Sequence, residues 1–300
     1  MKYNINLHGP IPRLFAGEYP DKFSNPSDLC TKKNWMGTLY EDGHSKEYRI
    51  PMNCLKYRTR YLPRAVRLGH IAITPFAGIR YAINRWTEPG DIVLDPFAGS
   101  GTTLYEACLF ERKAIGIEFE FPDITRLAME PFKTGWEVYE GDALEKLDKV
   151  KNESIALVNL SNPYPKGGDK NQKILTGKMG KSKNGKEFPD VGVFDYKKEG
   201  NLGLLTGNGY WDKMTEIHAK VCSKVKKGGH VVFVIKDTMK KREIVPLHEK
   251  LANTLPDSME FIGTYCAPHY PTTLFMNTYP KRFPGVPIPR EQISPVFIKK

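Results

Sequence analysis

The sequence predicts an α/β fold, with a mostly parallel sheet that is covered by helices on both faces. Residues 91–103 have the pattern of a short apolar strand, a turn with two glycines and the beginning of a helix. Further along the chain, short apolar runs alternate with stretches of helical periodicity. Such alternation is typical of βαβ units with right-handed crossovers. We expect an irregular arm over residues 1–47 and one α/β domain over residues 48–300.

Composition narrows the class of protein. The chain has 300 residues and 40% hydrophobic content, which is enough for a sizeable core. It contains no run of eighteen apolar residues, and residues 1–17 lack the apolar centre of a signal peptide, so we expect a cytoplasmic protein that does not enter a membrane. The five cysteines are odd in number and widely spaced, which argues against a disulfide framework and against a metal site.

Charge points to a polyanionic partner. The formal net charge is +11 and the sequence pI is about 9.2. Prolines interrupt residues 1–47, which is why this arm is expected to be irregular. In residues 47–70, arginines and a lysine interleave with tyrosines, so that Arg58 and Arg60 are expected to contact phosphates. The alternative for this stretch is a solvated helix face with its tyrosines in the core.

The stretch from residue 70 to 112 predicts a ligand site. An apolar-periodic helix is expected from about Phe76 to Trp86, followed by a strand over residues 92–94 with Asp95 at its carboxyl end. Gly99 and Gly101 allow the backbone to approach a ligand closely, and a helix is expected over residues 102–112.

Two further strands end in acidic residues. The strand over residues 113–118 ends in Glu118, in the position where nucleotide-binding folds hold ribose hydroxyls. The strand over residues 136–139 leads to Asp142, whose carboxylate suits an adenine amino group. The chain has no Walker phosphate loop, so these acids favour a neutral or cationic nucleoside over a triphosphate.

The remaining elements follow in order. A strand over residues 154–160 ends in Ser161-Asn162-Pro163-Tyr164-Pro165, and a lysine- and glycine-rich loop follows. A helix is expected over residues 207–226, a strand over 230–236, a helix over 243–255, and final strands over 259–265 and 295–298. Residues 166–208 are interpreted as a basic loop insertion, and residues 266–292 as an extended segment that contacts substrate.

Residues 95–103, Asp-Pro-Phe-Ala-Gly-Ser-Gly-Thr-Thr, resemble the cofactor motif of the DNA amino-methyltransferases, which modify N4 of cytosine or N6 of adenine. The resemblance extends from about Lys56 to the carboxyl end. It implies a Rossmann-like class I methyltransferase fold with a seven-stranded sheet, one strand of which is antiparallel near the edge. It also implies S-adenosylmethionine (S-adenosyl-L-methionine) as cofactor, held by Thr74, Phe76, Asp95, Pro96, Phe97, Gly99, Gly101, Thr102, Thr103, Glu118 and Asp142.

In this family the strand corresponding to residues 154–160 ends in Ser-, Asn- or Asp-Pro-Pro-Tyr, and the present chain departs from all three. We align Ser161, Pro163 and Tyr164 with the motif, which leaves Asn162 in place of the first proline. The other register, with Asn162 leading, deletes a proline and misplaces the ring. In the first register, the Ser161 hydroxyl and the main-chain carbonyl of Asn162 accept the hydrogens of the target amine, and Tyr164 stacks on the base.

The resemblance implies a DNA amino-methyltransferase of the restriction-modification type, and the leading serine favours N4 of cytosine over N6 of adenine. The basic residues expected to contact DNA in the loop are Lys166, Lys170, Lys173 and Lys178. Methylation of an RNA base, a non-catalytic nucleic-acid-binding relative and a small-molecule methyltransferase are alternatives. The cofactor motif precedes the strand-end motif here, so the chain is permuted relative to many members of the family.

Overall fold

The computed structural model describes residues 38–40, 47–49, 74, 76–165, 198–235, 237–240, 243–268 and 291–300 of the chain. Among the helices in these ranges, none is long and apolar enough to span a membrane.

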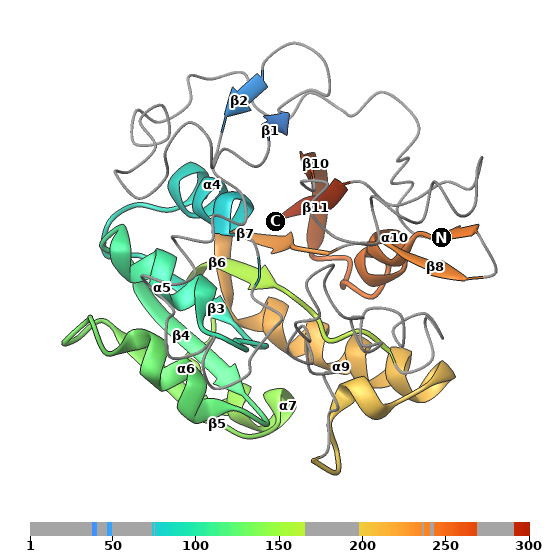
Figure 1. Cartoon of the computed structure of the whole chain (residues 1–300), viewed down its shortest axis with the longest axis horizontal. Coiled ribbons are helices and arrows are strands. Elements are labelled where there is room, and N and C mark those ends of the chain that lie inside the picture. Colours follow the sequence, from blue (N-terminus) through green and yellow to red (C-terminus); the bar gives the residue numbers. More distant parts are fainter. Residues whose placement is uncertain are drawn as a thin grey trace, which may run out of the picture.

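The centre of the fold is a mixed sheet of nine strands in the order β2-β1-β10-β11-β7-β6-β3-β4-β5 (Figure 1). Five of its strands run parallel to one another: β3 (Ile92–Asp95), β4 (Lys113–Glu118), β5 (Trp136–Glu140), β6 (Ile155–Leu160) and β7 (Val225–Phe233). Next to β7 lies β11 (Glu291–Lys299), which is antiparallel both to β7 and to β10 (Met259–Pro268). These seven strands confirm the predicted sheet, with its one antiparallel strand next to the edge.

Two short strands extend the sheet beyond β10. β1 (Thr38–Tyr40) pairs with β10 through Tyr40 and Cys266, and β2 (Glu47–Arg49) pairs with β1. β1 lies within residues 1–47, the segment that the sequence predicted as an irregular arm, and neither of the two strands was predicted. Their three-residue length is too short for an alternating pattern to stand out from the surrounding prolines, and the edge of β10 supplies the pairing.

Helices α4 (Phe76–Trp86), α5 (Thr102–Leu109) and α6 (Pro122–Met129) cover one face of the sheet. Their apolar side chains, such as Ile83 and Leu104, form one buried cluster with Val93, Leu157 and Val232 from the strands. Because side chains alternate along a strand, the neighbouring strand residues point to the opposite face.

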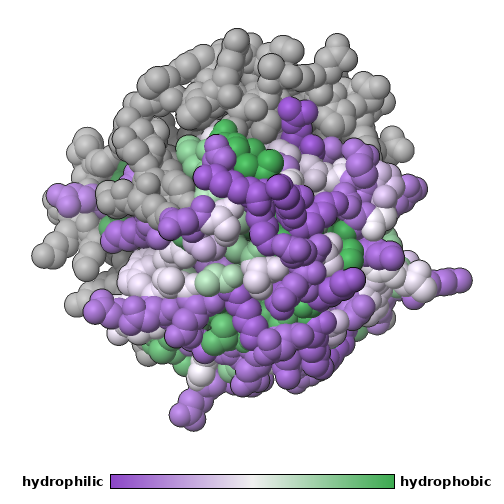
Figure 2. All heavy atoms as spheres, turned by 180° about the vertical axis from the view of Figure 1, so that it is seen from behind, coloured by the Kyte–Doolittle hydropathy of each residue, from purple (hydrophilic) through white to green (hydrophobic). Residues whose placement is uncertain are grey.

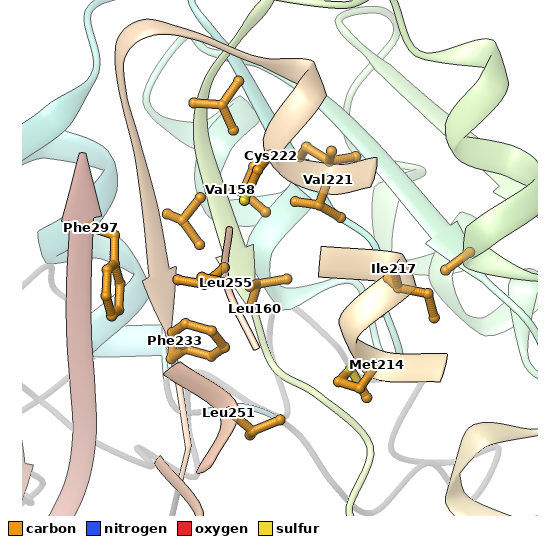
Figure 3. Packing of buried hydrophobic residues seen from close by; sticks show 14 of the residues in the cluster. Val158, Leu160, Met214, Ile217, Val221, Cys222, Phe233, Leu251, Leu255 and Phe297 are labelled. Carbon is orange, nitrogen blue, oxygen red and sulfur yellow. The ribbon is translucent and has the colours of Figure 1, made fainter. Parts of the chain in front are cut away.

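The opposite face packs against α7 (Ala143–Lys146), α9 (Gly207–Lys224) and α10 (Leu247–Ala252). Figure 3 shows this second cluster, in which Val158 and Leu160 of β6 meet Met214, Ile217 and Val221 of α9. Each of these five side chains is fully buried. Burial on both faces explains why the parallel strands are almost uniformly apolar in the sequence.

The chain between α9 and α10 differs from the prediction. The expected helix over residues 243–255 is instead β9 (Glu243–Val245), which pairs with β8 (Thr238–Lys240), followed by α10. Pro246 precedes α10. Because proline lacks an amide hydrogen and restricts the residue before it, a helix that continued through this position would lose a backbone hydrogen bond.

The end of α9 also differs. The helix was expected to reach residue 226, but it stops at Lys224 and β7 begins at Val225, so the Lys-Lys-Gly-Gly stretch of residues 226–229 lies within the strand. Between Val225 and His230 the pairing with β6 shifts register, and Gly228 has φ 75° there. Gly228 and Gly229 thus permit this shift of register within the strand.

The insertions predicted at residues 166–208 and 266–292 lie largely outside the described residues. Of the first, the structure describes 198–208, which contain the short 3₁₀ helix η3 (Leu202–Leu204) and the first turn of α9. Of the second, it describes 266–268 in β10 and 291–292 in β11, where Pro268 pairs with Glu291. Seen from behind, the described surface is mainly hydrophilic with small apolar groups (Figure 2).

Candidate active site

The predicted site residues at the ends of four parallel strands come together at one edge of the sheet. β3 pairs with β4 on one side and with β6 on the other, and β4 pairs with β5. The carboxyl ends of these strands carry Asp95, Glu118, the Gly141-Asp142 turn and Ser161, in that order along the chain. In an open α/β sheet this edge is where ligands bind.

The turn after β3 is held by Asp95, which is only 2% exposed. Its Oδ1 accepts a hydrogen bond from the Phe97 amide at 3.0 Å, and its Oδ2 accepts one from the Thr103 hydroxyl at 2.5 Å. Thr103 in turn accepts a hydrogen from the Asn159 side-chain amide at 2.9 Å. The hydrogen bonds of Asp95 and Thr103 therefore fix the conformation of the turn and connect β3, α5 and β6.

Burial raises the pKa of Asp95 from its ordinary value of 3.8 to about 6. The hydrogen bonds from Thr103 and Phe97 act in the opposite direction, and the nearby charge of Glu118 raises the pKa further. The site thus holds two carboxylates whose mutual repulsion a positively charged ligand would offset.

Glu118 fastens the glycine turn to the end of β4. Its Oε2 accepts from the Gly99 amide at 2.8 Å, and its Oε1 accepts from the amides of Glu120 and Phe121 at 2.8 and 3.0 Å. A carboxylate oxygen has two lone pairs, so Oε2 keeps one acceptor position beyond the bond to Gly99. The carboxylate orders the turn and retains capacity for a ligand hydroxyl.

The glycines of the turn have the backbone conformations expected of them. Gly99 and Gly101 have φ of 51° and 81°. A Cβ on Gly101 would lie 3.2 Å from the Cβ of Ala128 and 3.3 Å from the carbonyl oxygen of Thr125. Thr125 also donates to the Gly99 carbonyl at 2.6 Å. Helix α6 therefore packs closely beneath the turn, a contact that the sequence did not predict.

The other predicted cofactor residues surround this turn. Pro96, Thr102 and Thr103 are buried, Phe97 is half-buried against the second core cluster, and Thr102 shares a hydrogen bond with Ser100 at 3.2 Å. Asp142 caps α7 by accepting from the Leu144 amide through Oδ1 at 2.7 Å, which leaves Oδ2 outside that hydrogen bond. Phe76 is the first residue of α4.

Ser161 and Asn162, directly after β6, point to opposite faces of the sheet. The Ser161 hydroxyl lies 3.3 Å from the Thr74 hydroxyl, on the side of α4. The Asn162 side chain is 3% exposed and lies against α9, where its Nδ2 is 2.8 Å from the Nε2 of His218 and 2.9 Å from the sulfur of Met214. This is the alternation of a strand, continued for two residues past its end.

Helix α9 also contacts the next residue of the turn. The Tyr210 hydroxyl donates to the Pro163 carbonyl at 2.6 Å, and Tyr164 is half-buried against the second core cluster. Tyr210, His218, Thr125 and Asn159 were not predicted as site residues. Their spacing in the sequence is that of ordinary core positions, and only their partners reveal their role.

The residues present fit S-adenosylmethionine. The three acids, the glycine turn at the beginning of α5 and the acceptor capacity of Glu118 and Asp142 suit a nucleoside with positive charge. The predicted nucleic-acid contacts Arg58, Arg60, Lys166, Lys170, Lys173 and Lys178 lie outside the described residues.

Comparison with known proteins identifies similarity to DNA methylases. Residues 18–126 match the family model for N6- and N4-type DNA methylases, a match that begins earlier in the chain than the resemblance in the sequence suggests. The type II methyltransferase M.EcaI of Enterobacter cloacae is 46% identical over 43 residues, which are 14% of this chain and 10% of that protein. The orphan methyltransferase M.BamHII of Bacillus amyloliquefaciens is 49% identical over 61 residues, or 20% of this chain and 23% of that protein.

The chain thus matches less than a quarter of the length of these curated relatives. Among solved structures, a TehB-like SAM-dependent methyltransferase from Corynebacterium glutamicum aligns with 81% of this chain and 98% of its own, at 14% identity and a TM-score of 0.41. The sequence matches confirm the resemblance of this chain to the DNA amino-methyltransferases.

Proposed function

We propose that this relative of the DNA amino-methyltransferases methylates the exocyclic amine of a base in DNA, with N4 of cytosine preferred over N6 of adenine. One observation carries the proposal: the Ser161 hydroxyl and the Asn162 peptide stand at the end of β6, next to the glycine turn after β3, and Thr74 reaches Ser161 from the beginning of α4. S-adenosylmethionine, when bound, supplies an electrophilic methyl group.

Asp95 and the glycines shape the cofactor turn, Glu118 offers an acceptor to ribose hydroxyls and Asp142 offers its Oδ2 to the adenine amine. Thr74, just before α4, contacts Ser161, and Phe76, the first residue of α4, is assigned to the cofactor from the resemblance. These assignments follow from which acceptor positions the fold leaves available. They are the same roles that the sequence predicts, and they remain part of the proposal.

The chemistry at the base requires two acceptors. The lone pair of an exocyclic amine is delocalised into the ring, so the amine becomes nucleophilic only when its hydrogens are held in a tetrahedral arrangement. Ser161 Oγ and the Asn162 carbonyl each accept a hydrogen bond from one N–H of the amine, and Tyr164 stacks on the extruded base. The Ser161 hydroxyl shares a hydrogen bond with the Thr74 hydroxyl in which either oxygen can donate, and when Ser161 donates, its own lone pairs remain available to the amine.

The burial of Asn162 supports the register in which Ser161 leads. If Asn162 were the leading residue, its side chain would have to reach the base, yet its amide is buried against His218 and Met214. The same burial weakens the non-catalytic alternative. Asn162 departs from the family motif, but its side chain points away from Ser161 and does not obstruct it.

Methyl transfer is tested with labelled S-adenosylmethionine, unmethylated DNA and, in parallel, RNA, followed by mass analysis of the nucleosides. We expect N4-methylcytosine or N6-methyladenine in DNA, lost in Ser161→Ala and retained in Ser154→Ala, a serine just before the opposite end of β6. Label in RNA alone would show that the substrate is RNA and not DNA. Cofactor binding without transfer to either polymer would overturn the proposal in favour of the non-catalytic relative.

A further inference from the structure

The contacts that attach the turn after β6, residues 161–164, to α9 include two hydrogen bonds whose partners on the helix, Tyr210 and His218, are eight residues apart. Tyr210 donates to the Pro163 carbonyl at 2.6 Å, and His218 meets the Asn162 amide at 2.8 Å. We call the second contact, with its continuation to Thr254, the His218 clamp. It involves the one residue, Asn162, at which this chain departs from the family motif.

The hydrogen-bond directions in the His218 clamp follow from its far end. The Thr254 hydroxyl donates to the Leu251 carbonyl at 2.6 Å, because a carbonyl can only accept. Its oxygen lies 2.5 Å from His218 Nδ1 and therefore accepts from an Nδ1–H. His218 Nε2 then carries a lone pair and accepts from the Asn162 Nδ2. The ring is thus neutral, with the proton on Nδ1.

The surroundings favour this neutral form. His218 is fully buried, and burial lowers its pKa to about 3. A proton on Nε2 would face the two hydrogens of the Asn162 amide. The other hydrogen of that amide points to the Met214 sulfur at 2.9 Å. Both donors of Asn162 are therefore used on the α9 side, and the rotamer of its side chain is fixed.

We propose that His218 is a positioning residue, which holds Asn162 against α9 so that the Asn162 carbonyl stays aimed at the target amine. This inference rests on the proposed function. In the relatives, a proline stiffens the backbone at this position, and a proline ring restricts φ to a narrow range. In this chain a buried hydrogen bond from the side chain restrains the same peptide.

The His218 clamp is tested with His218→Leu, with Asn162→Pro and with the double variant of both. His230→Leu is the control, since His230 is a half-buried histidine whose pKa is also lowered, to about 4, but it stacks on Trp86 and pairs with Leu157 in the middle of β6 instead of contacting the turn. His218→Leu should reduce kcat roughly 10- to 100-fold, because a misplaced acceptor weakens alignment of the amine. The cofactor Kd should stay within about twofold, and Tm should fall no more than in the control.

Restoration by proline distinguishes positioning from general damage. In Asn162→Pro alone, His218 Nε2 loses its donor and remains buried, so the single variant is expected to be impaired. In the double variant there is no unpaired nitrogen and the proline supplies stiffness, so kcat should recover most of the loss. A kcat that falls equally in His218→Leu and His230→Leu, or that proline fails to restore, overturns the proposal.

Hydrogen exchange gives a measurement that does not require turnover. The amides of Ser161, Asn162 and Tyr164 should exchange faster in His218→Leu than in the wild type, and should be unchanged in His230→Leu. If the wild type methylates no nucleic acid but the exchange difference is present, the proposed function fails and the clamp stands. Equal exchange rates at these amides in all three proteins would contradict the proposed role of the His218 clamp, even if the enzyme is active.

Discussion

The Thr74 hydroxyl lies 3.3 Å from the Ser161 hydroxyl, although 87 residues separate them in the chain. Thr74 stands before α4 and Ser161 directly after β6, so the contact joins the segment bordering the cofactor turn to the proposed acceptor of the target amine. The proposed catalytic turn thus depends on a contact between segments that are far apart in sequence.

Thr74→Val is expected to lower kcat by roughly three- to tenfold, in keeping with the loss of one neutral hydrogen bond of about 1 kcal/mol. Valine removes the hydroxyl that contacts Ser161, so the Ser161 hydroxyl loses the partner that orients it. Steady-state methyl transfer is the measurement, and Thr74→Ser, which keeps a hydroxyl, should retain most activity. If the valine variant is as active as wild type, Thr74 does not orient Ser161.

Cofactor affinity should decrease as pH falls through about 6. Burial raises the pKa of Asp95 to about 6, and a cationic ligand near Asp95 and Glu118 favours the ionised form. Binding should therefore release part of a proton near pH 6, and affinity should fall by at most about tenfold per pH unit below it. Calorimetry in buffers of different ionisation enthalpy measures the proton release directly.

Asp95→Asn is the control for this titration, because its Kd should be nearly independent of pH between 5 and 8. In the unliganded protein, the contribution of Asp95 to folding stability changes with pH in the opposite direction to cofactor affinity. A raised folded-state pKa means that Asp95 contributes stability below 3.8 that is lost as pH rises through about 6. A wild-type Kd that is constant across pH 6 would contradict the proposed charge relationship.

Gly101→Ala should both destabilise the protein and weaken cofactor binding. The φ of 81° costs an alanine about 1–2 kcal/mol, and the new Cβ would crowd Ala128 and the Thr125 carbonyl. Gly90→Ala is the matched control for Gly101→Ala, since Gly90 has φ 88° and no atom lies within 4 Å of its added Cβ. We expect similar backbone strain in Gly90→Ala but an unchanged cofactor Kd, measured by denaturant titration and by ligand binding.

Glu106→Gln should destabilise the fold by about 3–5 kcal/mol, because it removes the negative charge that Glu106 holds against the buried guanidinium of Arg80. The pair joins α4 to α5 through contacts of 2.7 and 3.2 Å. Asp123→Asn is the comparison: it breaks the exposed pair with Arg126 and should change the free energy of unfolding by less than about 1 kcal/mol. Similar losses in the two variants would show that the buried pair is unimportant.

The strands and the acids at their ends were predictable because both are local properties of the sequence. A strand buried on both faces is a short apolar run, and Asp95 and Glu118 follow such runs directly. Parallel strands then bring these ends to one edge whatever the details of packing. The same local signals failed where neighbours decide the structure, as at β1, which pairs with β10, and at β9, which pairs with β8.

The sequence by itself thus determined the sheet, the cofactor turn and the positions of Ser161 and Asn162. The tertiary structure alone decided which way those two side chains point and what holds them. His218 and Tyr210 lie on the buried stripe of α9 and are indistinguishable in sequence from packing residues. Their role arises because α9 crosses the sheet beside the end of β6, and a hydrogen bond between segments 56 residues apart depends on that placement and leaves no periodic signal in the chain.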